Sequence, residues 1–353
     1  MPALNEVCAR IAPVDREAAQ QAQRLLDVKT KPRRSLGRLE DLACQLAAVQ
    51  RTPTPRVGDK AIVVLGADHG VAESGGVSAY PQAVTAQMLA NFANGGAAIN
   101  VLARQAGARV VVVDMGVRGP LAPHPRIRAL RIGDGTRDFT VGPAMQQEQA
   151  VRAIEAGMQV AFEVIQQGAT LIGIGEMGIG NTTAASALTA ALTGASPIEV
   201  TGRGTGVDDA GLARKRAAIE RALQVNAPNP RDVLDTMSKL GGFELAGLCG
   251  VVLAAAAAGV AVIMDGFIAS TAALCAVRLV RDVEGYLIAS HRSVEPGHRH
   301  VLAALRAQPL LDLELRLGEG TGAALAMGVV QSAVAILHEM ATFDAAGVSD
   351  SGA

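Results

Sequence analysis

Two glutamates stand in glycine-rich runs, where a carboxylate could accept or donate a proton. The first, Glu319, lies in RLGEGTGAAL, residues 316–325, at the predicted start of a long helix that Thr321 is expected to cap. Gly318 and Gly320 allow unusual backbone conformations and let a ligand approach the main chain. From this run alone, proton transfer by Glu319 and a simple first-turn acid favoured by the helix dipole are equal alternatives.

The second glutamate, Glu176, stands in LIGIGEMGIGNTTAASAL, residues 171–188. Residues 170–174 predict a buried strand, and residues 175–180 a glycine-rich turn that leads into an alanine-rich helix. Free N–H groups and hydroxyls at a helix start suit a phosphate monoester, although a tight turn with ordinary caps is the alternative. The predicted phosphate cradle comprises Gly178, Gly180, Asn181, Thr182 and Thr183.

This cradle matches neither of the common nucleotide signatures. The chain has no GxxxxGK[ST] run, so a P-loop is unsupported. The GIGEMGIG spacing lacks the acidic residue after a second strand that a dinucleotide fingerprint needs.

Continuous apolar runs, separated by helical stretches, predict strands that are covered on both faces. They are residues 61–66, 109–114, 170–174, 261–265 and 285–289. This order favours an α/β fold with a mostly parallel, Rossmann-like sheet flanked by helices, in which ligands lie beyond the C-terminal strand ends. Polar candidates follow these strands: Asp68, His69, Asp114, Glu176, Asp265, Ser290 and His291.

The two ends of the chain are predicted to form a small helical subdomain. Residues 1–55 are largely helical and contain the loop KTKPRRSLGRLE, and residues 321–353 supply a further long helix. The alternating threonines and prolines of residues 52–55 cannot continue a helix. Residues 56–320 are therefore expected to be the α/β catalytic domain.

Composition excludes several classes of protein. A net charge of -1 over 353 residues gives no reason to expect nucleic acid or a membrane surface as partner. The four cysteines have no CxxC spacing, which argues against a metal knuckle or a disulfide framework and suits a reducing cytosol. The N-terminus does not resemble a signal peptide, so we expect a cytoplasmic protein. The uncharged residues 248–264 are too few for a membrane span and predict a buried helix followed by a strand.

Long motifs resemble the nicotinate-nucleotide–dimethylbenzimidazole phosphoribosyltransferase family, which builds the lower ligand of cobalamin. The resemblance spans about residues 31–340, with Arg33 and Arg34 where the family often has Pro-Gly, and Tyr80 at a variable position. These departures concern loop shape and base preference. The motifs are KPRRSLGRLE, ADHGVAESGGVSAYPQAVTAQM, GEMGIGNTTAASAL, GGFELAG, DGFIASTAAL and RLGEGTGAALAM.

The resemblance implies transfer of 5-phosphoribose from nicotinate mononucleotide to a benzimidazole nitrogen, with release of nicotinate. The leaving pyridinium becomes neutral at its ring nitrogen and needs little acid catalysis. The proton that must be removed is therefore the N–H proton of the incoming azole. Glu319 resembles the family's general base, Glu176 its second acid and Lys215 its phosphate-contacting lysine. The resemblance also implies a homodimer with small-molecule substrates, and the chemistry demands no metal or cofactor.

The remaining candidates for substrate binding are Arg316, Gly318 and Asp265, which stand within the resembling motifs, and possible walls for an aromatic base. Tyr80, Met88 and Phe267 could form such walls, although core packing is the commoner role of these side chains. Two other functions stay open: the same reaction with a purine or phenolic acceptor, and a non-catalytic sensor of the nucleotide. Two glutamates beside the cradle disfavour the sensor, because binding an anion gains nothing from added negative charge.

Overall fold

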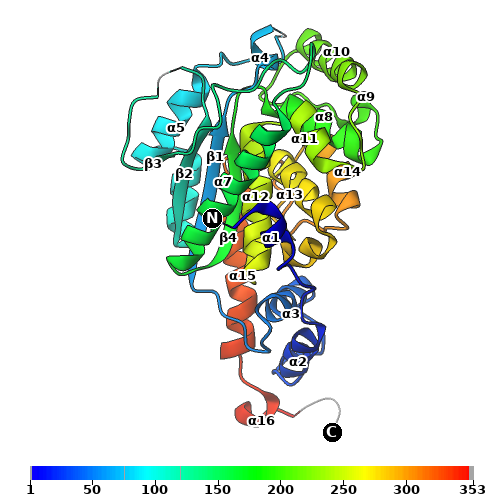
Figure 1. The fold of residues 1–353 in the computed structure, drawn as a ribbon. Helices are drawn as coiled ribbons and strands as arrows, with labels where there is room; N and C mark the ends of the chain where they lie inside the picture. Colours follow the sequence, from blue (N-terminus) through cyan, green and yellow to red (C-terminus); the bar gives the residue numbers. More distant parts are fainter. Residues whose placement is uncertain (1, 75, 120, 350–353) are drawn as a thin grey trace.

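A parallel sheet of six strands forms the centre of the protein, in the order β3-β2-β1-β4-β5-β6 (Figure 1). The structure, a computed structural model, describes residues 2–74, 76–119 and 121–349. The order reverses between β1 and β4, and sheets of this type bind ligands beyond the carboxyl ends of the strands at that point. The predicted α/β fold is thereby confirmed. The strands are β1 (Asp59–Ala67), β2 (Ala108–Gly116), β3 (Ile127–Ala129), β4 (Ala169–Met177), β5 (Ala261–Met264) and β6 (Leu287–Ala289).

The strand predictions need four corrections. Strand β4 continues through Glu176, which pairs with Leu65 of β1, so Glu176 belongs to the strand end and not to the following turn. Asp114 likewise lies inside β2, and the short edge strand β3 was not predicted. Gly285 begins no strand, because Arg281–Tyr286 form a 3-10 helix (η1) before β6.

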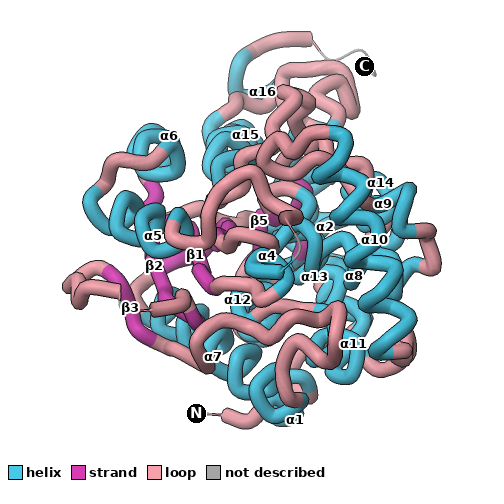
Figure 2. Tube along the Cα trace, turned by 90° about the horizontal axis from the view of Figure 1, so that it is seen from above, coloured by secondary structure: helices cyan, strands magenta, loops and turns pink. Residues whose placement is uncertain are grey.

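Helices cover both faces of the sheet. Figure 2 shows α5, α6 and α15 on one side of the strands and α7 and α12 on the other. The helices are α1 (Leu4–Cys8), α2 (Arg16–Asp27), α3 (Arg38–Gln50), α4 (Val71–Ser74), α5 (Val84–Asn94), α6 (Ala98–Ala106), α7 (Gln147–Gln166), α8 (Asn181–Thr193), α9 (Pro197–Val200), α10 (Asp209–Asn226), α11 (Val233–Leu240), α12 (Phe243–Ala257), α13 (Phe267–Leu279), α14 (Gly297–Ala304), α15 (Thr321–Glu339) and α16 (Phe343–Ala346).

The N-terminal and C-terminal helices meet at one end of the molecule. Helix α3 packs against α2 and α15, and an antiparallel bridge joins Lys29 to Thr342 (Figure 1). Helix α1 packs instead against α7 and α12. The division at residues 55/56 and 320/321 stays a prediction.

Helix α15 is long and apolar enough to cross a membrane, judged by length and composition alone. Of its most apolar window, 56% is buried inside the fold, and the helix packs against β4, β5, α3 and α6. Its apolar character is therefore that of a core helix.

We expect the close approach of α7 and α12 to make Gly157→Ala strongly destabilising. An added Cβ at Gly157 would lie 1.8 Å from the carbonyl oxygen of Gly247, so the two helices would have to move apart. Such overpacking should lower the free energy of unfolding by about 3 kcal/mol, measured by urea denaturation. Gly328→Ala is the control, because a Cβ at this exposed position of α15 meets nothing within 4 Å. Equal stability of the two variants would contradict the prediction.

Candidate active site

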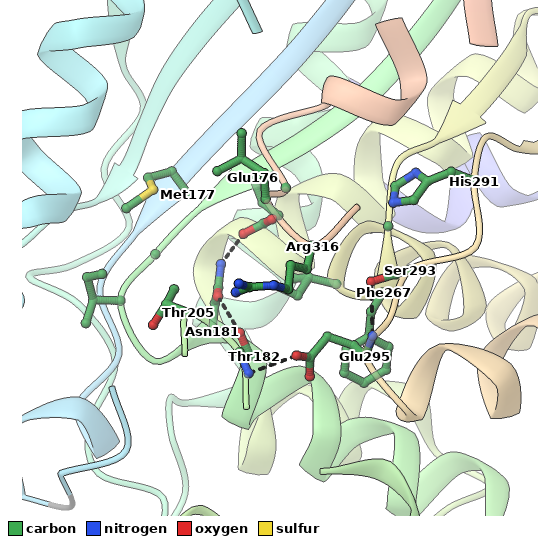
Figure 3. Close-up of a pocket in the computed structure, with 17 residues that line it drawn as sticks. Glu176, Met177, Asn181, Thr182, Thr205, Phe267, His291, Ser293, Glu295 and Arg316 are labelled. Atoms are coloured by element: carbon green, nitrogen blue, oxygen red, sulfur yellow. Dashed lines mark hydrogen bonds between the residues drawn. The ribbon is translucent and has the colours of Figure 1, made fainter. Parts of the chain in front are cut away.

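A pocket opens at the carboxyl ends of β4, β5 and β6 (Figure 3). Glu176 and Asn181 are joined by a hydrogen bond on one wall, while Ser293 and Glu295 belong to another. The lining residues are Glu176, Met177, Gly178, Ile179, Asn181, Thr182, Gly204, Thr205, Gly266, Phe267, Ile268, His291, Ser293, Glu295, Arg316, Leu317 and Gly318.

Glu176 is a buried carboxyl group that reaches the pocket from the end of β4. The Asn181 amide donates to its Oε2 atom, and a Cβ on Gly318 would lie 2.3 Å from its Oε1 atom. Burial raises the pKa of Glu176 well above its usual range, and the charges of Asp265 and Glu244 raise it further. The hydrogen bond from Asn181 opposes this rise in pKa. The environment of Glu176 therefore favours its protonated form.

Glu319 directly follows the lining residue Gly318 but is not itself among the residues that line the pocket, and it stands on a left-handed stretch of backbone. Gly318, Glu319 and Gly320 have φ values of 85°, 64° and 89°. Such a φ is costly for a residue with a side chain, and strain of this kind concentrates at functional sites. Burial raises the pKa of Glu319 to about 7, although a hydrogen bond from the Ile99 backbone opposes the rise. Its Oε2 atom is buried and has no hydrogen-bond partner among the described residues.

Asp265, at the end of β5, holds the Glu319 loop in place. Its carboxylate accepts hydrogen bonds from the backbone N–H groups of Gly320, Gly322 and Ala323, at 3.0, 2.7 and 3.3 Å. Burial nevertheless raises the pKa of Asp265 to about 7. Asp265, predicted to bind substrate, does not line the pocket and instead contacts the loop that carries Glu319.

The expected cap of α15 by Thr321 is wrong. Gly320 is the N-cap, and Thr321 is the first helical residue. The Thr321 hydroxyl donates to the carbonyl oxygen of Gly318 at 2.8 Å, which tightens the loop. The N–H groups at the helix start are satisfied by Asp265, an acid distant in sequence, so no local pattern could have predicted this cap.

The residues predicted to form a phosphate cradle lie at the start of α8, and their role in binding phosphate stays a prediction. Gly178, Asn181 and Thr182 line the pocket, as the strand-loop-helix pattern predicted. Gly180 is the N-cap, with a φ of 96°, and does not line the pocket. Thr183 is also outside the lining; its hydroxyl is buried without a hydrogen-bond partner in the part of the chain that the structure describes.

Lys215 stands behind the cradle rather than in the pocket wall. It is 2% exposed, and a Cβ on Gly204 would lie 2.9 Å from its Nζ atom and 3.4 Å from the Thr182 hydroxyl. Burial lowers the pKa of Lys215, while the charge of Glu295 opposes that change. A buried amine therefore lies directly behind two residues that line the pocket, Gly204 and Thr182.

Several residues that line the pocket were not predicted from the sequence. Glu295 is buried, its Oε1 atom accepts the Gly204 N–H at 2.8 Å, and Ser293 accepts the Glu295 N–H. Two sequence patterns could have indicated these residues. They are the glycine-rich turn TGRGTG at residues 201–206, before the helix of Lys215, and the run SVEPGH at residues 293–298, after the last strand.

Only some of the remaining candidates line the pocket. His291 and Phe267 line the pocket, and burial lowers the pKa of His291 to about 4, so its imidazole is neutral at pH 7. Tyr80 is 53% exposed and Met88 is partly buried on α5; neither lines the pocket. Arg316 is exposed and lines the pocket. Within the described residues, no group of three His, Cys, Asp or Glu side chains could hold a metal ion.

Comparison with known proteins identifies the class of enzyme. A family model described as phosphoribosyltransferase matches residues 11–348. The nicotinate-nucleotide–dimethylbenzimidazole phosphoribosyltransferases of Roseiflexus sp. (strain RS-1) and Chloroflexus aggregans are 56% and 53% identical to this chain, each over 99% of both chains. The crystal structure of CobT from Thermus thermophilus superposes with a TM-score of 0.91 at 50% identity, covering 94% of this chain and 99% of that one. The chain belongs to the nicotinate-nucleotide–dimethylbenzimidazole phosphoribosyltransferase family.

Proposed function

We propose that this enzyme moves 5-phosphoribose from nicotinate mononucleotide to 5,6-dimethylbenzimidazole, giving α-ribazole 5′-phosphate and nicotinate for the nucleotide loop of cobalamin. The substrates follow from the names of relatives that are more than half identical over the full chain. One observation carries the chemistry: a buried carboxyl group, Glu319, with a pKa of about 7, is held by strained backbone beside a second acid.

Glu319 is the base that removes the N–H proton of the benzimidazole. As one ring nitrogen attacks the anomeric carbon, the other nitrogen becomes acidic, because positive charge spreads over the ring. A carboxylate with a pKa near 7 is a stronger base than an ordinary one and is still ionised in half of the molecules at neutral pH. The bond to the pyridinium breaks without acid assistance, since nicotinate leaves with a neutral ring nitrogen.

Glu176 acts in the same site as a protonated carboxyl group. Its stronger burial and its three acidic neighbours keep it protonated at a pH where Glu319 is partly ionised. Carboxyl groups in unequal environments divide acid and base roles in this way. A protonated Glu176 can donate a hydrogen bond to the sugar or pass on the proton that Glu319 takes.

The phosphate lies in the cradle at the start of α8. Gly178, Asn181 and Thr182 line the pocket at the start of this helix, and Arg316 adds a positive charge at its exposed edge. Lys215, buried behind Thr182, supplies a positive charge where water does not screen it.

We also infer a cytoplasmic homodimer. The four cysteines are free, which suits a reducing compartment. The dimer rests on the family resemblance.

The choice of acceptor can be tested directly. We expect 5,6-dimethylbenzimidazole to cause release of nicotinate from nicotinate mononucleotide, measured by chromatography. A panel of other azoles, purines and phenols is tested in the same way as alternative acceptors. Release only with purines or phenols would overturn the proposed acceptor. No release with any acceptor would overturn the enzymatic function.

Glu319→Gln should lower kcat by about 10²- to 10⁴-fold, because a positioned general base contributes that much. Calorimetry should show nicotinate mononucleotide binding within a few-fold of the wild type. Wild-type kcat/KM should fall tenfold per pH unit below about pH 7, as Glu319 becomes protonated, and the variant should lack this limb. The control is Glu314→Gln, the same change at an exposed residue of the same segment. Near-normal turnover of Glu319→Gln would assign proton removal to another group.

Lys215→Ala should chiefly weaken nucleotide binding. Loss of a buried charge near the phosphate should raise the KM for nicotinate mononucleotide by about 10- to 100-fold, with a smaller effect on kcat. Lys60→Ala is the matched control, since Lys60 is also a buried lysine but lies at the start of β1, away from the pocket. An unchanged KM in Lys215→Ala would remove Lys215 from the phosphate site.

A further inference from the structure

His291 lines the active-site pocket, and the mechanism above gives it no role. It stands just after β6, and Figure 3 shows its imidazole extending toward the pocket. A parallel bridge to Leu311 holds its backbone. Burial lowers the pKa of His291 to about 4, so its ring is neutral at physiological pH and one ring nitrogen carries a proton. The position of that proton decides what the side chain can bind.

The hydrogen bonds of Ser290 assign the proton to Nδ1 of His291. The Ser290 hydroxyl donates to the carbonyl oxygen of Asp265 at 2.9 Å, and its oxygen lies 3.0 Å from Nδ1. A hydroxyl has one proton to donate, and a carbonyl oxygen can only accept. Ser290 is therefore the acceptor in its bond to His291, and Nδ1–H is the donor. Oδ1 of Asp265, which accepts the Gly322 N–H, lies 3.8 Å from Nδ1 and favours the same tautomer.

The two edges of the imidazole have different surroundings. The Nδ1 edge is packed against the start of α15, where a Cβ on Gly322 would lie 2.0 Å from Nδ1. The other edge lies over Gly266, a residue of the pocket, where a Cβ would lie 3.3 Å from Cε1 and 3.4 Å from Nε2. Within the described residues, Nδ1 has a hydrogen-bond partner and Nε2 has none. Nε2 therefore presents an unshared electron pair at the pocket wall.

The neighbouring histidine, His298, differs because both of its nitrogens are used within the protein. Its Nδ1 accepts the Ser293 N–H at 3.0 Å, and its Nε2 lies 3.1 Å from the Ser270 hydroxyl. Burial lowers the pKa of His298 to about 3, so this ring, 6.3 Å from that of His291 between centroids, is also neutral. His298 supports the wall through Ser293, while His291 keeps one nitrogen for a ligand.

We propose that Nε2 of His291 accepts a hydrogen bond from a ribose hydroxyl of the nucleotide, and that this contact selects a ribonucleotide over its deoxy analogues. An unprotonated nitrogen needs a donor, whereas an ionised phosphate and the nicotinate carboxylate offer only acceptors. The donors of the two substrates are the ribose hydroxyls and the N–H of the azole. The azole proton goes to Glu319, whose pKa of about 7 makes it a stronger base than His291. The inference rests on the proposed function, because it takes the ribose from the proposed substrate.

A neutral acceptor suits this part of the site. Glu176 and Glu295 already line the same pocket, and a further carboxylate would repel the phosphate of the nucleotide. An imidazole in a fixed tautomer binds a hydroxyl without adding charge. A site built in this way rejects an analogue that lacks the hydroxyl, because its own polar atom is then left unpaired.

The first test is calorimetric titration of the full-length enzyme with nicotinate mononucleotide and with its 2′-deoxy and 3′-deoxy analogues. In the wild type, the analogue without the contacted hydroxyl should bind about five- to tenfold more weakly than the nucleotide, as expected for one lost hydrogen bond. His291→Asn should bind the nucleotide more weakly by about the same factor. Asparagine keeps a donor for Ser290 but has no atom at the position of Nε2, so the variant should not distinguish that analogue from the nucleotide.

The matched control is His338→Asn. His338 is also a hydrogen-bonded histidine, with its Nε2 atom 2.7 Å from the Pro55 carbonyl oxygen, but it stands near the end of α15 and does not line the pocket. This variant should keep the wild-type preference for the ribonucleotide. If His291→Asn weakens binding of the nucleotide and of both analogues equally, or changes only the affinity for the azole, the proposal is wrong.

A second measurement uses the wild type, so it does not depend on the folding of a variant. In ¹⁵N NMR at neutral pH, with the ring signals of His291 assigned through bonds from its backbone, Nδ1 should be protonated and Nε2 unprotonated. Saturation with nicotinate mononucleotide should move the Nε2 signal toward that of a protonated nitrogen. A protonated Nε2 in the free enzyme, or an unmoved Nε2 signal at saturation, would overturn the proposal. Binding without these effects would refute this inference alone, whereas a wild type that does not bind the nucleotide would refute the proposed function.

Discussion

The carboxylate of Asp265 is the contact on which the rest of the site depends. It directly follows β5 and accepts three N–H groups at the start of α15, so one side chain ties the sheet to the helix that follows Glu319. A helix start that carries no local cap would otherwise leave buried donors unpaired, at a cost of about 1–3 kcal/mol each. Gly175 of β4 completes the arrangement, because a Cβ there would lie 2.3 Å from the backbone nitrogen of Gly320. The strained backbone of Glu319 persists because it is held from both sides.

Electrostatics explains how so many acids share a small volume. Burial raises the pKa of the carboxyl groups of Asp68, Glu176, Asp265 and Glu319, and hydrogen bonds to these groups oppose the rise. Lys215 is buried on the other side of the cradle, beside Glu295. The site thus places the carboxyl groups of raised pKa apart from the helix start that we propose binds phosphate, and Asn181 connects the two through its hydrogen bond to Glu176.

The fold and much of the site could be predicted from local sequence. Continuous apolar runs identified the main strands, and the glycine runs singled out Glu176 and the start of α8, which line the pocket, because each of these features depends on neighbouring residues. The roles assigned to Glu176, Glu319 and the cradle stay predictions. Glu295, the cap by Asp265 and the partnership of His69 with Glu244 depend on residues 55 to 175 positions apart, which no periodicity encodes. Tyr80 and Met88 show the reverse case: their residue types suited a wall for an aromatic base, but the structure places neither in this pocket.

The contact between Gly175 and Gly320 has a consequence for the variability of the enzyme. Glu176 follows the first glycine and Glu319 precedes the second, so the relative position of the two acids is fixed by main chain meeting main chain. This backbone contact itself involves no side chain of the pocket wall. Residues that select the acceptor base can therefore change in the course of evolution while the machinery for moving the proton keeps its dimensions.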